Sequence, residues 1–325
     1  MVKDLVLQLN KAADCSNSRS KNIGILRYLD IVMCMIAYGA SPNNYAMFEF
    51  DKLKSYQRKT YVTHRISENM IKKLNENKYR DLFENKLEFA RVFKRYLKRD
   101  YISSQCTEKE FLNFVEAHKK LIYKPVDAAQ ANGIMVFDFT SKSSKEMMET
   151  YNKIKSGNLG IIEEWIDQHD ELNDIYPDAV NCLRIITVNN NKKSDLLTGG
   201  ITFALKGQIA NGSKESLIAP INMKTGIIDK PAATFGSQMY EKHPITHKQI
   251  LNFKVPYWDA VVDMLNEAVQ LIPQVRYVGW DIAITKTGPC LIEGNTSPGY
   301  RYYQIPAHMK DGIGNREIYE KYLRG

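Results

Sequence analysis

The sequence predicts a fold of the α+β or mixed α/β class, with a helical N-terminal part and a strand-rich remainder. Apolar residues recur at helical spacing through much of residues 1–100, and from residue 121 the spacing becomes that of strands. Helices and strands then mix without regular strand–helix–strand units. Near the C-terminus, a pattern typical of a hairpin carries an acidic residue on each arm.

Three helices are predicted within the first 118 residues. Residues 23–40 have helical apolar spacing but carry two charged side chains, which favours a buried helix over a membrane span. Residues 82–97 form a second strongly periodic segment. A third helix is predicted over 111–118, and a capping-box pattern over 107–110 opens it.

After residue 120 the pattern becomes that of short strands separated by turns. The predicted strands cover residues 121–123, 134–139, 160–166, 182–188 and 200–205. One further helix is expected over 257–271, where Pro256 precedes an apolar periodic segment and Pro273 follows it.

The C-terminal hairpin is the most informative segment. An apolar run containing Asp281 reaches a turn at Thr287-Gly288, and the returning run ends at Glu293. Asn295 lies two residues further on, so it shares a face with Glu293. Three oxygen ligands without histidine or cysteine favour Mg²⁺ bound with phosphate over zinc. The alternative is a solvated acidic hairpin.

The segment 279–295 resembles the metal-binding hairpin of ATP-grasp enzymes, and in detail that of the sugar-transfer associated ATP-grasp proteins. The similarity covers most of the chain and is dense after about residue 80. The hairpin is specific to the group, whereas the other matching segments are individually weak. These are residues 38–41, 121–125, 163–166, 181–184, 243–244 and 255–258.

This resemblance implies an α+β ATP-grasp fold with a helical N-terminal region over residues 1–80. The ATP-grasp domain would cover 81–325, with a lid-like subdomain over about 104–166. It also implies ATP and Mg²⁺ as cofactors, with Asp281, Glu293 and Asn295 as the metal ligands.

Two lysines are candidates for binding the nucleotide phosphates. Lys124 follows a strand and precedes a loop, so its ammonium can meet phosphate oxygens. Lys86, after Asn85 at a helix start, resembles the family's first phosphate lysine. For either residue the alternative is an ordinary solvated lysine. The loop after Lys124 departs from the glycine-rich family pattern, because Ala128 and Ala131 stand where glycines are expected.

The segment 163–166 resembles the hinge on which adenine lies in this fold. Backbone groups at Glu163, Glu164 and Ile166 would meet the edge of adenine, so their side chains matter little. Asp170 or Glu171 would bind the ribose hydroxyls, and Asp170 is the preferred candidate. The alternative is an edge strand followed by an acidic turn.

Three further residues are assigned roles in catalysis or substrate binding. Arg184 lies in an apolar strand, so it needs a partner or faces a site. The resemblance implies that it faces the γ-phosphate, and a structural ion pair is the alternative. His243 lines an acceptor pocket or satisfies a loop carbonyl. Arg301 is a candidate for holding a substrate carboxylate, and a surface arginine is its alternative.

Composition limits the class of partner and the compartment. The net charge is +8, but basic residues such as those of 91–99 are interspersed with acidic ones and are interpreted as a solvated helix face. No nucleic-acid partner is therefore expected. Five cysteines without CxxC spacing indicate free thiols in a reducing cytoplasm. No signal peptide or membrane span is expected.

The predicted activity is an ATP-dependent carboxylate–amine ligase that forms an acyl phosphate and releases ADP. Its substrates would be small-molecule carboxylates and amines. By analogy with the group's name, a sugar acid or polysaccharide precursor is the expected acceptor. Two alternatives remain, a sugar kinase-like phosphotransferase on the same fold and a non-catalytic nucleotide-binding partner in glycan assembly. Phosphate-loop, dinucleotide-binding, kinase and hydrolase motifs are missing from the sequence.

Overall fold

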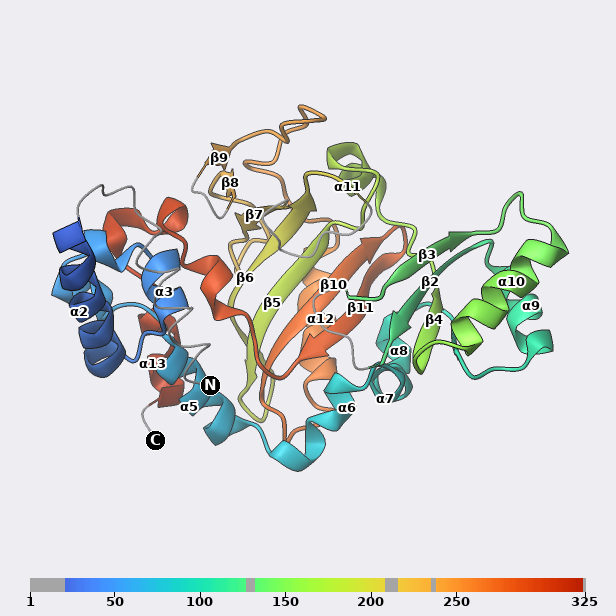
Figure 1. Ribbon diagram of the computed structural model, residues 1–325, viewed down its shortest axis with the longest axis horizontal. Helices are drawn as coiled ribbons and strands as arrows, with labels where there is room; N and C mark the ends of the chain where they lie inside the picture. Colours follow the sequence, from blue (N-terminus) through green and yellow to red (C-terminus); the bar gives the residue numbers. More distant parts are fainter. Residues whose placement is uncertain (1–20, 127–131, 208–215, 235–237, 324–325) are drawn as a thin grey trace.

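The computed structural model describes residues 21–126, 132–207, 216–234 and 238–323, and these build two antiparallel sheets flanked by helices (Figure 1). The larger sheet has seven strands in the order β11-β10-β5-β6-β7-β8-β9, and the smaller has four in the order β1-β4-β2-β3. Every paired strand in both sheets is antiparallel. The predicted α+β class is therefore confirmed.

The large sheet forms the centre of the molecule. Its strands are β5 (Cys182–Asn189), β6 (Ser194–Ala204), β7 (Ser216–Pro220), β8 (Ala232–Ala233), β9 (Met239–Tyr240), β10 (Tyr277–Thr285) and β11 (Gly288–Asn295). The β10–β11 pair is the predicted hairpin. β5 agrees with its predicted range, whereas β6 begins six residues before the predicted 200, because it continues the pairing with β5 through a bulge.

The two faces of the large sheet are covered differently. On one face, apolar residues of β5, β6 and β10 pack against α12 (Trp258–Ala268), which lies within the predicted helix 257–271. On the other face, Ile186, Val188 and Tyr277 pack against the N-terminal helices. In Figure 1 these helices lie on one side of the large sheet, and the small sheet lies on the other side, beside β11.

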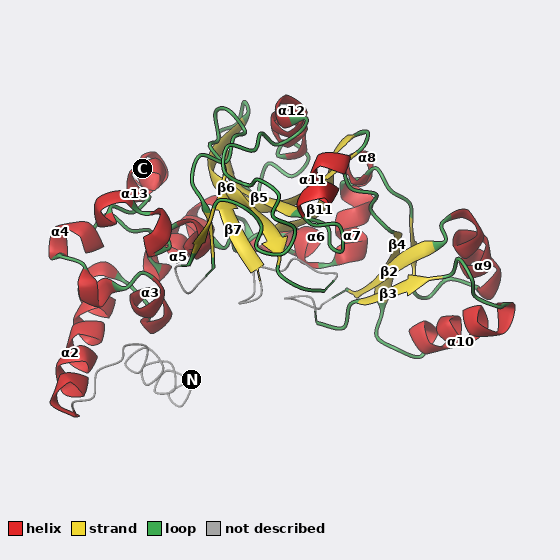
Figure 2. Cartoon of the chain, turned by 90° about the horizontal axis from the view of Figure 1, so that it is seen from above, coloured by secondary structure: helices red, strands yellow, loops and turns green. Residues whose placement is uncertain are grey.

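The small sheet carries two helices of its own. Its strands are β1 (Tyr101–Ser103), β2 (Lys120–Pro125), β3 (Met135–Asp138) and β4 (Gly160–Glu164). The helices α9 (Glu108–Ala117) and α10 (Ser144–Lys155) lie together beyond this sheet (Figure 2). The predicted capping box is present at the start of α9, where Thr107 accepts from Glu110 N. A separate apolar cluster holds this unit together.

The segment predicted as one helix over 82–97 is instead broken into three. These are α6 (Asp81–Glu84), α7 (Lys86–Val92) and α8 (Lys94–Leu97). The break has a local cause, because the side chain of Asn85 accepts from Leu87 N and Glu88 N and starts a new helix. The broken segment packs on β11, and Gly294 allows the close approach, since a Cβ there would lie 2.7 Å from the Phe83 ring.

The helical region joins both ends of the chain. It contains α2 (Lys21–Tyr38), α3 (Pro42–Met47), α4 (Ser55–Arg58), α5 (His64–Leu74) and α13 (Arg316–Leu323). The remaining short elements are α11 (Asp170–Ile175) and five 3₁₀ turns, η1 (Phe50–Lys52), η2 (Asn77–Tyr79), η3 (Tyr300–Tyr303), η4 (Pro306–His308) and η5 (Lys310–Gly312). In Figure 1, α13 lies beside α5, and both contribute to one apolar cluster.

The interpretation of residues 23–40 as a buried helix was wrong in part. Ile31 and Cys34 of α2 are fully buried, but Ile25, Leu29 and Ile36 on its other side are 57–67% exposed. Helical periodicity identified the element but could not tell which of its two apolar stripes meets the core. Across the described ranges, no helix is long and apolar enough to span a membrane.

Candidate active site

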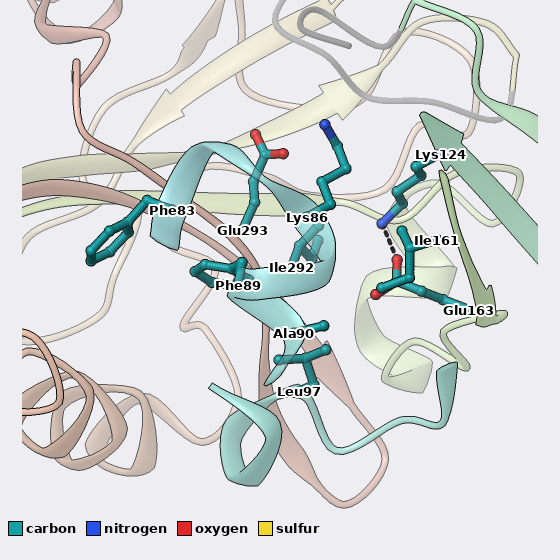
Figure 3. Close-up of a pocket in the computed structure, with 10 residues that line it drawn as sticks. All are labelled: Phe83, Lys86, Phe89, Ala90, Leu97, Lys124, Ile161, Glu163, Ile292 and Glu293. Carbon is teal, nitrogen blue, oxygen red and sulfur yellow. Dashed lines mark ion pairs between the residues drawn. The ribbon is translucent and has the colours of Figure 1, made fainter. Parts of the chain in front are cut away.

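A pocket of about 300 Å³, including the space at its mouth, lies where the two sheets meet (Figure 3). Its wall is formed by residues from the helices α6, α7 and α8, from strands β2 and β4 of the small sheet, and from β11. They are Phe83, Lys86, Phe89, Ala90, Leu97, Lys124, Ile161, Glu163, Ile292 and Glu293. The wall is mostly apolar with a few convergent charges, which is the usual composition of a small-molecule site.

A bulge in the hairpin shapes one side of this pocket. Asp281 pairs with Glu293 and Ile282 pairs with Leu291, so Ile292 is the extra residue. Neighbouring residues of a regular strand point to opposite faces. Because the bulge interrupts this alternation, both Ile292 and Glu293 line the pocket.

The two predicted phosphate lysines both line the pocket. Lys86 is the first residue of α7, directly after the capping Asn85, and its Nζ lies 3.5 Å from Val126 O. Lys124 is on β2, and its Nζ lies 2.5 Å from Glu163 Oε2 (Figure 3). The two lysines therefore line one pocket, and their role in binding nucleotide phosphates stays a prediction. The loop positions Ala128 and Ala131 lie outside the described residues.

Glu163 is the most deeply buried charged residue of the pocket wall. Its main partner is Arg99, which the sequence did not indicate. Arg99 donates two hydrogen bonds to Glu163 Oε1, one of them from Nε at 2.9 Å. Burial acts to raise the pKa of Glu163, but Arg99 and then Lys124 hold it below the usual value. Glu163 is therefore ionised at neutral pH.

The interpretation of residues 91–99 as a solvated face was wrong for Arg99. Its side chain is only 2% exposed. It also donates to the carbonyls of Leu97 and Leu291. Arg99 lies just beyond the end of α8, where the chain turns into β1, so the helical pattern that makes Arg91 and Arg95 solvent-facing no longer applies.

Three charged residues form a row across the central strands. Asp281 on β10 is directly opposite Arg184 on β5 and Glu293 on β11. Arg184 donates to both carboxylate oxygens of Asp281, and lies 3.9 Å from Glu293 Oε1. Asn295 Nδ2 lies 3.3 Å from Glu293 Oε1, which confirms that Asn295 and Glu293 share a face.

The two carboxylates of this row perturb each other. Burial raises the pKa of Asp281 to about 6, although Arg184 acts in the opposite direction. Burial also acts to raise the pKa of Glu293, but Asp281 and the charges of Arg184, Lys124 and Lys86 bring it below its usual value. Of the two carboxylates, Asp281 therefore takes up a proton more readily, and a divalent cation beside the pair would stabilise its ionised form.

The other hinge candidates lie outside the pocket wall. Glu164 turns away, and its Oε2 lies 3.0 Å from His118 Nδ1, while His118 Nε2 lies 3.1 Å from Asp100. Ile166 is half-buried in the chain that leaves β4. Asp170 is 79% exposed and lies 3.5 Å from Lys286 Nζ. Their roles at adenine and ribose stay predictions.

The two substrate candidates differ in placement. His243 is fully buried, and its Nε2 lies 3.0 Å from the backbone carbonyl of Ala204 at the end of β6, so it satisfies a carbonyl, although one of a strand rather than of a loop. Arg301 is half-buried on η3, the turn that follows β11. In the same turn, Tyr303 donates to Arg184 O, so η3 lies against the charged row. Arg301 stays a prediction as a substrate ligand.

A central antiparallel sheet and a smaller sheet that meet at a lysine-bearing pocket beside a carboxylate hairpin define an ATP-grasp protein. The sequence profile of the sugar-transfer associated ATP-grasp family matches residues 65–317, and the chain belongs to this family. The resemblance drawn from the hairpin is thereby confirmed.

Several solved ligases are similar in structure. The ligase PsnB complexed with a minimal precursor has 11% identity and a TM-score of 0.46, over 77% of this chain and 63% of that one. An L-amino acid ligase from Bacillus licheniformis has 15% identity and a TM-score of 0.42, over 69% and 45%. The D-alanine-D-alanine ligase from Coxiella burnetii has 10% identity and a TM-score of 0.40, over 74% of this chain and 53% of that one. The chain thus spans less than two thirds of each. No curated protein matches it.

ATP and Mg²⁺ are the ligands of an ATP-grasp protein, and the residues present fit both. Lys86 and Lys124 supply positive charge in a pocket whose wall is mostly apolar and also carries Glu163 and Glu293. Asp281, Glu293 and Asn295 supply hard oxygen donors, and burial, with a smaller contribution from the neighbouring Glu293, raises the pKa of Asp281. These three residues would hold Mg²⁺, which would neutralise phosphate charge there.

Proposed function

We propose that this protein is an ATP-dependent carboxylate–amine ligase that acts through an acyl phosphate. The observation that carries the proposal is the convergence of Lys86, Lys124 and the row Arg184–Asp281–Glu293 on one region. Such a set serves transfer of the γ-phosphoryl group, because cations stabilise the charge that spreads over its oxygens. The ATP-grasp unit is assigned to residues 81–325, with residues 104–166 as its lid.

In the proposed reaction, a substrate carboxylate oxygen attacks the γ-phosphorus of ATP. The bond to the β-phosphate breaks, and ADP leaves. An amine then attacks the acyl carbon, loses a proton and displaces inorganic phosphate. Lys86 and Lys124 hold the polyphosphate, and Arg184 faces the transferring group with its planar fork. Arg301, on the turn η3 whose Tyr303 contacts Arg184, binds the substrate carboxylate. We assign the acceptor to the sugar acids or other polysaccharide precursors.

An isotope experiment separates a ligase from a phosphotransferase on the same fold. An acyl-phosphate route moves one carboxylate oxygen into inorganic phosphate, whereas a sugar kinase leaves the phosphoryl group on its acceptor. Carboxylate substrate labelled with ¹⁸O is therefore expected to yield labelled phosphate, and hydroxylamine is expected to trap a hydroxamate. An ADP-release screen of sugar acids and amino acids supplies the substrate. A phosphorylated sugar as the sole product contradicts the ligase.

The role of Lys124 is tested by comparing ADP with adenosine. Lys124→Gln is expected to weaken the binding of ADP by roughly 1.5–3 kcal/mol, because a charge-assisted phosphate contact is lost. The affinity for adenosine is expected to stay nearly unchanged. Calorimetric titration in the presence of Mg²⁺ measures both. Lys142→Gln is the matched control, since Lys142 is exposed and pairs with Glu146 outside the pocket. Equal losses for ADP and adenosine contradict the phosphate contact.

A further inference from the structure

The side chains of Arg99, Glu163 and Lys124 form a triad whose net charge is +1. Two cations share one carboxylate, with Arg99 on Glu163 Oε1 and Lys124 on Oε2. The side chains of Arg99 and Glu163 are 2–3% exposed, whereas that of Lys124 is 11% exposed and lines the pocket. The excess positive charge is therefore presented to the pocket through Lys124.

Without Arg99, the remaining pair would be neutral. Glu163 and Lys124 alone form a close ion pair, in which the negative charge of Glu163 cancels the positive charge of Lys124. Arg99 engages Glu163 from outside the pocket wall and returns the net charge of the triad to +1. A buried carboxylate is costly, and its partners are normally arranged to offset it. Here they more than offset it, which favours an anionic ligand at the pocket.

Arg99 also fixes where this charge lies. Its Nη1 donates to the carbonyl of Leu97, at the end of α8, and to that of Leu291, two residues before Glu293 on β11. One guanidinium thus joins the end of α8, the end of β4 and the hairpin. A lysine has no fork that could make these contacts together.

We propose that Arg99 is a positioning residue for the nucleotide, which holds Glu163 so that the charge of Lys124 is left for the polyphosphate. This inference rests on the proposed function, because it takes the ligand of the pocket to be a nucleotide. It assigns Arg99 no contact with the nucleotide itself. The competing explanation is a buried salt bridge that serves folding alone.

The charge of the triad can be varied in steps. Arg99→Gln sets it to 0, Glu163→Gln to +2, and the double variant returns it to the wild-type +1. Calorimetric ADP affinity with Mg²⁺ is expected to be highest for Glu163→Gln, equal for wild type and the double variant, and lowest for Arg99→Gln. Each unit of charge is expected to change the affinity for ADP roughly tenfold, and to change the affinity for adenosine much less.

Controls separate charge from folding and from the proposed function. Arg95→Gln, which removes an exposed arginine paired with Glu267, is expected to leave ADP affinity unchanged. If Arg99→Gln fails to fold, the order of Glu163→Gln, wild type and the double variant still decides. Any other order, or equal effects on ADP and adenosine, overturns the role of Arg99. Failure of the wild type to bind ADP would instead overturn the nucleotide site.

Discussion

Replacing Glu293 by Gln is expected to lower Mg²⁺-dependent ADP release by about a thousandfold while the protein stays folded. Glu293 is directly opposite Asp281 on the hairpin, and each carboxylate alters the pKa of the other. A neutral amide keeps the shape of the side chain but loses the charge that a hard divalent cation requires. The measurement is ADP release against Mg²⁺ concentration, with Tm recorded for the same preparation.

The matched control for this change is Glu88→Gln. Glu88 is on α7 close to Lys86, but it is half-buried, does not line the pocket and pairs with Arg91. Its replacement is expected to leave ADP release unchanged. Asp281→Asn should resemble Glu293→Gln in activity and in addition lower Tm, because it breaks the fork with Arg184. Normal Mg²⁺ dependence in folded Glu293→Gln protein contradicts the metal site.

The hairpin could be predicted from the sequence because its determinants are local. The turn, the apolar runs and the two-residue spacing of Glu293 and Asn295 follow from side-chain alternation alone. Arg184 could be flagged for a similar reason, since a charge in an apolar strand needs a partner. Its partner, Asp281, lies 97 residues away in sequence. The pairing of the two residues therefore depends on strand register. The bulge at Ile292 also depends on register.

Arg99 could not be found by periodicity. Its neighbours Arg91 and Arg95 are solvent-facing, and nothing local distinguishes the third arginine of the series. It is buried because the chain leaves α8 and enters β1 at this point, and because Glu163 arrives from 64 residues away. The break at Asn85 is different, since an asparagine two and three residues before helical N–H groups is a recognisable cap.

The exposure of α2 and the position of α13 show the same limit. Helical spacing identifies an apolar stripe, but α2 has apolar residues on both sides and only one side meets the core. Which side is buried depends on the elements that pack there. One of the clusters concerned includes Tyr319 and Tyr322 from α13, at the opposite end of the chain. Such long-range packing leaves no local signal in either segment.

Arg184→Lys is expected to lower kcat roughly a hundredfold while ADP affinity is nearly unchanged. In the proposed function Arg184 faces the γ-phosphoryl group, and in the structure its Nε and Nη2 donate to the two carboxylate oxygens of Asp281. A lysine keeps the charge but cannot hold the carboxylate and a planar phosphoryl group in one plane. An interaction made mainly in the transition state affects kcat rather than ground-state binding.

Arg58→Lys is the matched control, because Arg58 makes the same two-pronged contact with Asp30 in the helical region, away from the pocket. That change is expected to lower Tm without altering kcat. Measuring kcat, ADP affinity and Tm for both variants separates catalysis from folding. If Arg184→Lys behaves like Arg58→Lys, with stability lost and kcat intact, then the fork between Arg184 and Asp281 is a structural ion pair, and the γ-phosphoryl group must be stabilised by other residues.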